Sequence, residues 1–253
     1  MDYADFKVEA RRLLDIDLNS YKEQQMQRRI LQWIARYNLQ DYSGLIREIS
    51  TRPQQKTKFY EYLTINTSHF YRDVNVFRYL EDNILPAIAK GNRPKLWSAG
   101  CSIGAEVYSL VMIMLEKKLS FSQILATDID DAVLQKAKQG IYAANQLNSL
   151  AKHLLDRYFV LNQNQYVLSD KVKQHVVFSK HNLLKDSYER NFDLILCRNV
   201  FIYFTNEVQE ELIRNFTHAL KPKGYFVVGS AEQVMNPSLF GLSRVSYCIY
   251  QKD

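Results

Sequence analysis

Two patterns of hydrophobic and polar positions divide the chain. Over residues 1–62 apolar side chains recur at spacings of three and four, as in YKEQQMQRRILQWIARY, which is typical of amphipathic helices. From residue 95 short apolar runs follow instead, namely KLWSA, QILATDI, HVVFSKHN, DLILCRN and YFVVGS, which read as buried strands. The pattern therefore predicts a small all-α domain over 1–62, a connecting segment over 63–94 and a second domain over 95–253.

The second domain alternates strands with helices that are expected to begin near Gly104, Asp130 and Thr205. Such alternation implies right-handed crossovers and a mostly parallel sheet, so the predicted fold class is α/β. The segment SRVSYCIYQK alternates as one more strand. Residues 158–178 break the rhythm with short alternating runs around Asn and Asp, which predicts a small antiparallel β excursion there.

Composition narrows the class of protein. The 253 residues carry 33 Lys and Arg against 27 Asp and Glu, a net charge of +6 that weakly favours an acidic partner. No apolar run approaches a membrane span, and the start MDYADFKVEARR lacks the apolar core of a signal peptide, which predicts a cytoplasmic protein without membrane insertion. The three cysteines lie far apart and the five histidines have no metal-ligand spacing, so no metal is expected.

The stretch SAGCSIGAEVYSL follows the first predicted strand and reads as a glycine-containing turn that opens a helix. It is neither GxGxxG nor a phosphate loop, and Glu106 would repel a phosphate but attract an ammonium or sulfonium. Complementing the helix dipole is an equally good reason for Glu106. Asp128 ends the next strand, where a carboxylate can accept from both hydroxyls of a ribose, although an N-cap role is the alternative. These residues together point to S-adenosylmethionine.

The fourth strand ends in CRNVFIYF and lacks the [DN]PP[YF] motif of many N-methyltransferases. With LTINTSHFYR, SAGCSIGAEVYSL, ATDID, HNLL and GYFVVGSAEQ, in this order and spacing, it resembles the chemotaxis-receptor glutamate methyltransferases, the CheR family. The resemblance covers nearly the whole chain. It implies a Rossmann-like class I methyltransferase sheet and transfer of a methyl group from S-adenosylmethionine to glutamate carboxylates of chemotaxis receptors.

The resemblance also assigns roles to residues. Arg72 would pair with the carboxylate of the cofactor, with an interdomain ion pair as the alternative. Tyr203 would lie near the transferred methyl group, with a place in the core as the alternative. Apart from the resemblance, Arg198 is a nearby cation that would either attract the acceptor or form a structural ion pair. The cofactor-binding residues that it implies, together with those inferred above, are Asn66, Ser68, Arg72, Glu106, Asp128, Asn182, Leu183, Asn199 and Val200. The sequence departs from the family at Ala105 and Val107, where the family usually has Glu and Pro, which puts cofactor affinity in question.

Cations on the predicted helix YKEQQMQRRILQWIARY point to the substrate side. Lys22, Arg29 and Arg36 recur every seven residues and share one face, with Arg28 adjacent. They form either a solvated basic face or, as the resemblance implies, a docking surface for the cytoplasmic methylation helices of the receptors. Some family members also grip a receptor C-terminal pentapeptide with a glycine-containing β subdomain. The stretch 158–178 has no glycine, so strong pentapeptide binding is not expected.

Two other functions remain open from the sequence. One is a methyltransferase with a different protein or RNA acceptor, although the chain lacks the aromatic-interleaved basic surface that favours nucleic acid. The other is a non-catalytic module that binds S-adenosylmethionine or a receptor, which the departures at Ala105 and Val107 suggest. The intact CRNVFIYF motif favours catalysis.

Overall fold

The computed structural model describes residues 1–64 and 68–253. Its contacts divide the chain into two compact units, one of Met1–Asn66 with Ile202–Glu210, the other of Thr67–Phe201 with Glu211–Asp253. Nowhere in the described ranges is a helix both long enough and apolar enough to cross a bilayer.

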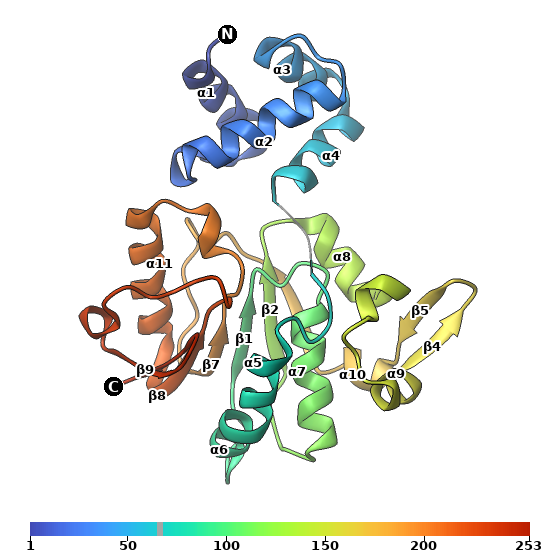
Figure 1. The fold of residues 1–253 in the computed structure, drawn as a ribbon, viewed down its shortest axis with the longest axis vertical. Helices are drawn as coiled ribbons and strands as arrows, with labels where there is room; N and C mark the ends of the chain where they lie inside the picture. The colour runs from blue at the N-terminus through green and yellow to red at the C-terminus, as the bar shows by residue number, and fades with distance from the viewer. Residues whose placement is uncertain (65–67) are drawn as a thin grey trace. The chain divides into compact units, whose positions relative to one another are not determined.

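The first unit is helical, as predicted (Figure 1). Its helices are α1 Tyr3–Leu14, α2 Glu23–Arg36, α3 Tyr42–Thr51 and α4 Pro53–Leu63, with the short 3-10 helix Leu18–Ser20 before α2. Asp2 and Asp41 accept hydrogen bonds from the first turns of α1 and α3, which explains where those helices begin. The predicted apolar stripe of α2 faces the core, where Met26, Ile30 and Trp33 are buried.

The second unit contains a seven-stranded sheet in the order β6-β2-β1-β7-β8-β10-β9 (Figure 1). Its strands are β1 Leu96–Ala99, β2 Ile124–Asp128, β6 Val176–Lys180, β7 Phe192–Leu196, β8 Leu220–Val227, β9 Leu242–Ser246 and β10 Ile249–Lys252. The first five are mutually parallel, and β10 runs antiparallel to both of its neighbours. The fully buried Leu96, Trp97, Leu194 and Ile195 show why the central strands read as continuous apolar runs.

Helices follow the strands as alternation predicts. They are α5 Val74–Tyr79, the π-helical turn Leu80–Ile84, α6 Leu85–Ala89, α7 Ala105–Glu116, α8 Asp131–Gln139, α9 Lys152–Tyr158, α10 Asp170–Lys173 and α11 Asn206–Ala219, with short 3-10 turns at Ala144–Leu147, Phe201–Tyr203 and Pro237–Phe240. The predicted starts near Gly104, Asp130 and Thr205 agree with α7, α8 and α11.

Two details differ from the expectation. The segment SRVSYCIYQK forms two strands, β9 and β10, which pair antiparallel across a turn at Tyr247 and Cys248. The sequence pattern did not reveal this turn, because the alternation of apolar and polar residues continues through it. The small antiparallel sheet has the order β3-β5-β4, with β3 Ile141–Ala143, β4 Phe159–Asn162 and β5 Gln165–Leu168. It begins before the predicted range of 158–178, and Val176 to Phe178 belong to β6 of the main sheet.

Candidate functional site

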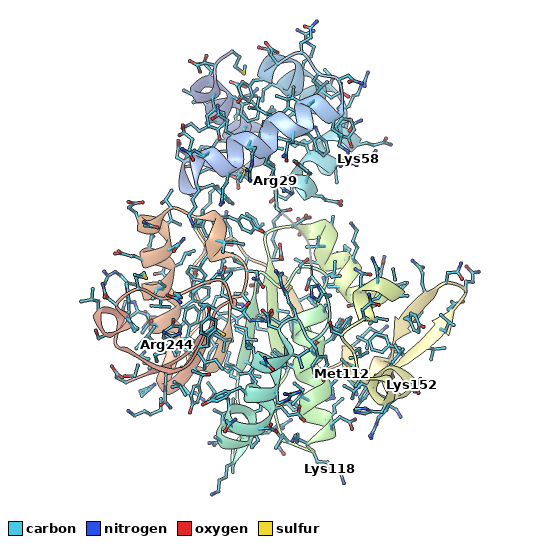
Figure 2. The ribbon with its side chains drawn as sticks, viewed as in Figure 1. Arg29, Lys58, Met112, Lys118, Lys152 and Arg244 are labelled. Carbon is cyan, nitrogen blue, oxygen red and sulfur yellow. The ribbon has the colours of Figure 1, made fainter. Side chains whose placement is uncertain are left out.

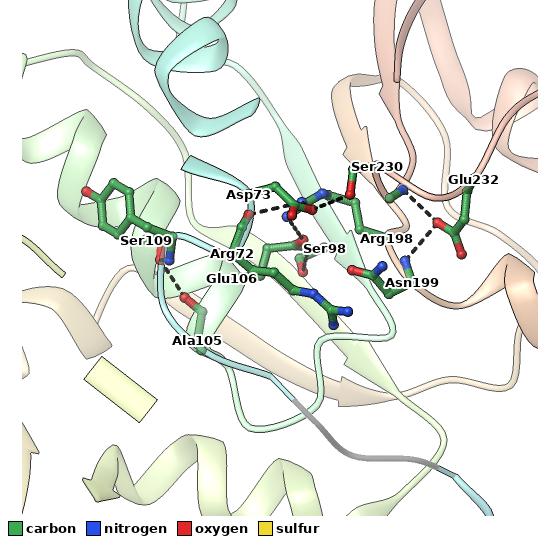
Figure 3. A network of polar contacts seen from close by, with 12 residues as sticks. Arg72, Asp73, Ser98, Ala105, Glu106, Ser109, Arg198, Asn199, Ser230 and Glu232 are labelled. Carbon is green, nitrogen blue, oxygen red and sulfur yellow. Dashed lines mark hydrogen bonds and ion pairs between the residues drawn. The ribbon is translucent and has the colours of Figure 1, made fainter. Parts of the chain in front are cut away.

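The strand order reverses between β1 and β7, which places the turns after these strands next to each other at the carboxyl edge of the sheet. In open α/β sheets this reversal is where ligands bind. The turns after β2, β6 and β8 reach the same edge. Six of the nine predicted cofactor-binding residues, namely Glu106, Asp128, Asn182, Leu183, Asn199 and Val200, lie at these strand ends or at the start of the following helix. The network that links several residues of this edge is drawn in Figure 3.

The turn after β1 is shaped by left-handed backbone. Gly100 has φ +72° and Gly104 has φ +82°, values that favour glycine. The main-chain N–H groups of Gly100 and Cys101 both donate to the carbonyl of Thr127 at 2.8 Å. A Cβ on Gly100 would lie 2.7 Å from Cγ2 of Val200. The turns after β1 and β7 are therefore so close that only glycine fits at position 100.

This close approach predicts a large effect of Gly100→Ala. The variant combines a left-handed non-glycine residue with a steric clash, so the unfolding free energy of the second unit should fall by about 2–4 kcal/mol. Gly91→Ala is the matched control, because Gly91 has φ +71° but nothing within 4 Å of its Cβ position, and it should cost only about 1 kcal/mol. Urea unfolding in a Trp33→Phe background, where Trp97 is the only tryptophan, measures both. Equal losses would contradict the close approach.

Asp128 lies at the end of β2 and is buried. Its Oδ2 accepts from the N–H of Ser102 at 2.8 Å and its Oδ1 accepts from the N–H of Asp130 at 3.1 Å. Burial raises the pKa of Asp128 to about 6, although both hydrogen bonds act to lower it. The helix α8 is capped by Asp130, whose side chain accepts from Ala132, so Asp128 is not the N-cap.

Ser102 adds an unused polar group beside Asp128. It has φ 49°, and its hydroxyl is buried without a hydrogen-bond partner among the described residues. A buried hydroxyl without a partner is costly unless a ligand or water satisfies it. An ionised carboxylate has about four acceptor positions, and the three main-chain N–H groups that act on Asp128, those of Ser102, Ile129 and Asp130, leave acceptor capacity unused. This corner therefore offers several hydrogen-bonding positions to a polar ligand.

Glu106, in the first turn of α7, is held by two partners. Its Oε1 accepts from the hydroxyl of Ser98 at 2.8 Å, and its Oε2 lies 3.2 Å from Nη1 of Arg198. Arg198 is only 2% exposed and also pairs with Asp73, whose Oδ2 is 2.7 Å from Nη2 (Figure 3). Of the two roles open for Arg198, this geometry matches the structural ion pair.

Arg72 and Asn199 also lie at this edge. The carbonyl of Arg72 accepts from Nη2 of Arg198 at 3.0 Å, and Figure 3 shows its side chain beside Glu106 and Asn199. Asn199 adopts a left-handed φ of 61°, and its N–H donates to Oε2 of Glu232 at 2.8 Å. Val200 follows it and faces Gly100. Ser68 is half-buried, whereas Asn66 lies outside the described residues.

Asn182 and Leu183 form the turn after β6. Oδ1 of Asn182 accepts from the N–H of Leu184 at 2.9 Å, and the carbonyl of Leu183 accepts from the hydroxyl of Tyr188 at 2.9 Å. The preceding residue, His181, donates its N–H to the carbonyl of Asp128 at 2.9 Å. The turn is thereby joined to the end of β2.

Several acidic or hydroxyl residues of this network were missed in the sequence, among them Asp73, Ser230 and Glu232. Ser230 donates to Oδ2 of Asp73 at 2.9 Å, and Glu232 accepts from the N–H groups of Gly229 and Asn199. A signal for the last two was available, since GSAE directly follows a buried strand, as the other site residues do. Asp73 has no periodic signal of its own.

The remaining predicted residues belong to the first unit. Tyr203 lies in a 3-10 turn, and its carbonyl accepts from the N–H of Lys22 at 2.8 Å. Arg29, which is labelled in Figure 2, stacks 4.1 Å above the ring of Tyr62, and its Nε donates to the Tyr62 carbonyl at 2.9 Å. Arg28 and Arg36 are exposed. The four cations therefore differ in how accessible their charged groups are to a docking protein.

Comparison with known proteins identifies the family. Residues 1–64 match the model of the CheR methyltransferase all-alpha domain, and residues 66–248 match that of the CheR methyltransferase SAM binding domain. The chain belongs to the CheR methyltransferase family. It is an S-adenosylmethionine-dependent methyltransferase with the class I sheet that the resemblance implied.

Relatives of the CheR family match over almost the whole chain. A protein named chemotaxis protein methyltransferase from Listeria monocytogenes is 36% identical, over 99% of this chain and 97% of its own length. Chemotaxis protein methyltransferase 1 from Pseudomonas aeruginosa is 31% identical, over 93% of this chain and 91% of its own length. A solved structure of PKMT2 from Rickettsia typhi with AdoHcy covers 64% of this chain and 26% of that one, at 19% identity and a TM-score of 0.39, too distant to inform the site.

Proposed function

We propose that this chain methylates glutamate side chains of chemotaxis receptors and forms glutamate methyl esters. The observation that carries the proposal is the match over 99% of the chain to a relative named chemotaxis protein methyltransferase. S-adenosylmethionine, when bound, supplies an activated methyl group on a sulfonium. A glutamate with an ordinary pKa near 4.3 is already a nucleophilic carboxylate at neutral pH, so the protein has to align the acceptor rather than deprotonate it.

The residues at the carboxyl edge of the sheet fit the cofactor. Asp128 keeps acceptor capacity for a ribose hydroxyl beside its main-chain hydrogen bonds, and the unpartnered hydroxyl of Ser102 lies in the same buried corner. Glu106 is the carboxylate for the ammonium, and Arg72 is the guanidinium for the carboxylate. We assign Asn182 and Leu183 to the adenine side, and Asn199, Val200, Ser68 and Asn66 to the rest of the pocket.

Tyr203 is the residue that we assign to the acceptor side, where its hydroxyl would orient the glutamate carboxylate or line the path of the methyl group. Arg198 supports the site through its ion pairs rather than by contact with the acceptor. We prefer this role to direct attraction of the substrate, because the Arg198 side chain is 2% exposed and pairs with two carboxylates.

The receptor's methylation helices are the proposed docking partner of α2. Support comes from the exposed Arg28 and Arg36, which suit an acidic helix. Arg29 contributes less, because its guanidinium is engaged with the ring and the carbonyl of Tyr62. The basic surface is thus narrower than the heptad spacing indicates.

Transfer of a tritiated methyl group to receptor cytoplasmic fragments tests the function. We expect label in the fragment that is released as methanol by mild base, since esters hydrolyse under conditions that leave N-methyl groups intact. A fragment in which the labelled glutamates are replaced by alanine is the control. Label that resists base would indicate a different acceptor atom.

A pentapeptide from a receptor C-terminal tail is expected to bind only weakly. The turn between β4 and β5 contains Gln163 and Asn164 and no glycine, in contrast to the glycine-containing loop of the family members that grip such tails. Fluorescence anisotropy of a labelled pentapeptide should show no saturation at low micromolar protein, with a scrambled peptide as control. Micromolar or tighter binding of the true sequence alone would contradict this expectation.

A further inference from the structure

The three residues Tyr71, Arg72 and Asp73 are held in an unusual backbone conformation. Tyr71 has φ 50° and Asp73 has φ 62°, both in the left-handed region that non-glycine residues seldom adopt. The N–H of Tyr71 donates to the hydroxyl of Ser109 on α7 at 3.1 Å. On its other side the segment is held by Arg198, which lies just beyond β7. Strained backbone that is fastened at both ends determines where the intervening side chain, Arg72, points.

Asp73 is the residue on which the second fastening depends. Nη2 of Arg198 donates both to Oδ2 of Asp73 at 2.7 Å and to the carbonyl of Arg72 at 3.0 Å. The same Oδ2 accepts from the hydroxyl of Ser230, beyond β8, at 2.9 Å (Figure 3). One carboxylate thus connects the segment that carries Arg72 to the turns after two strands.

The same contacts set the charge around Glu106. Arg198 is shared between Asp73 at 2.7 Å and Glu106 at 3.2 Å, so three charged groups leave one net negative charge. If Asp73 lost its charge, the buried Arg198 and the partly buried Glu106 would form a neutral pair. Glu106 would then attract an ammonium group less strongly, because the cation beside it would no longer be shared.

We propose that Asp73 is a positioning residue for the amino-acid end of S-adenosylmethionine. Through Arg198 it orients Arg72 toward the carboxylate of that end and leaves Glu106 negative for its ammonium. This inference rests on the proposed assignment of Glu106 and Arg72 to the cofactor. It makes no demand on the adenosine end, which Asp128 binds at the next strand.

Two ligands that differ only at the amino-acid end separate this role from a structural one. S-adenosylhomocysteine carries the ammonium and carboxylate, whereas 5′-methylthioadenosine keeps the adenosine and sulfur and lacks both groups. Calorimetry at pH 8 on wild type and Asp73→Asn should show at least a tenfold loss of affinity for S-adenosylhomocysteine and less than a twofold change for methylthioadenosine. Ser230→Ala removes a neutral hydrogen bond to Asp73 and should give a two- to threefold loss for S-adenosylhomocysteine alone.

The outcomes separate a failure of the Asp73 role from a failure of the cofactor site. The role of Asp73 would be overturned if neither Asp73→Asn nor Ser230→Ala distinguished the two ligands, that is, if the affinities for both ligands fell equally or did not fall at all. The cofactor site would then stay in place. If Asp73→Asn does not fold, Ser230→Ala decides alone, through its loss of affinity for S-adenosylhomocysteine relative to its loss for methylthioadenosine. Wild-type protein that binds neither ligand would overturn the proposed cofactor site, and the role of Asp73 with it.

Discussion

Asp128→Asn is expected to lower the affinity for S-adenosylhomocysteine at pH 8 by roughly ten- to a hundredfold. The reason is the loss of a charge-assisted acceptor for ribose hydroxyls, an interaction of about 1.5–3 kcal/mol. Asparagine is preferred to alanine, because Asp128 also accepts from the N–H groups of Ser102 and Asp130, and alanine would leave both unpaired. Calorimetry gives the affinities.

The wild-type affinity should also depend on pH. Burial raises the pKa of Asp128 to about 6, and protonation removes one acceptor, so the affinity should fall as pH decreases below 6. The nearby His181 has its pKa lowered from 6.5 by burial and is the other group that titrates close by. The pH dependence that Asp128 contributes should be absent in Asp128→Asn.

As pH rises, Asp128 should change the folding stability in the direction opposite to its effect on cofactor affinity. Because the folded pKa of Asp128 is raised from 3.8 to about 6, the folded state holds the proton more tightly than the unfolded state. The stability from this group is therefore present below pH 3.8 and is lost as pH rises to 6, at a cost on the order of 3 kcal/mol. The ionised carboxylate is kept at the expense of stability, as expected for a binding residue.

Asp131→Asn is the control for Asp128→Asn. It removes the same charge three residues away, from an exposed side chain that pairs with Lys180. Its affinity for S-adenosylhomocysteine should stay within about twofold of wild type, because exposed charges are screened by solvent. Equal affinities for Asp128→Asn and Asp131→Asn would remove Asp128 from the cofactor site.

Arg28→Glu combined with Arg36→Glu is expected to raise the Michaelis constant for receptor fragments by about tenfold at low salt. Both side chains are exposed on α2, and reversal converts attraction toward an acidic helix into repulsion. Added salt should weaken the wild-type interaction and leave the variant nearly unchanged, since exposed charges are screened over about 8 Å at physiological ionic strength. Affinity for S-adenosylhomocysteine should not change.

A control pair with the same charge change lies on other helices of the first unit. Lys58 on α4, which is labelled in Figure 2, and Arg47 on α3 are exposed. Arg47→Glu with Lys58→Glu should leave receptor kinetics near wild type. Arg29→Glu is a poor probe, because it would also break the contacts with Tyr62. If both pairs raised the Michaelis constant equally, net charge rather than the α2 surface would govern docking.

The sequence alone was enough to predict the all-α first domain, the central parallel strands and the strand ends at which the candidate site lies. The three-and-four spacing of Met26, Ile30 and Trp33 already states which face of α2 is buried, because helix periodicity is a local property. The position of Asp128 follows in the same way from the end of an apolar run. The hairpin of β9 and β10 and the start of the small sheet were not predicted, because strands of three to five residues contain too few positions to show a clear periodicity.

Which charged side chains meet depends on the tertiary structure. Asp73 and Arg198 are 125 residues apart and pair because the sheet order brings the turn after β7 against the connecting segment. Tertiary packing likewise took Arg29 out of the basic row that its heptad spacing predicts, by placing Tyr62 of α4 beneath its guanidinium. Spacing along a helix specifies a shared face, but what covers that face depends on segments far away in the chain, and those long-range contacts have no local signature.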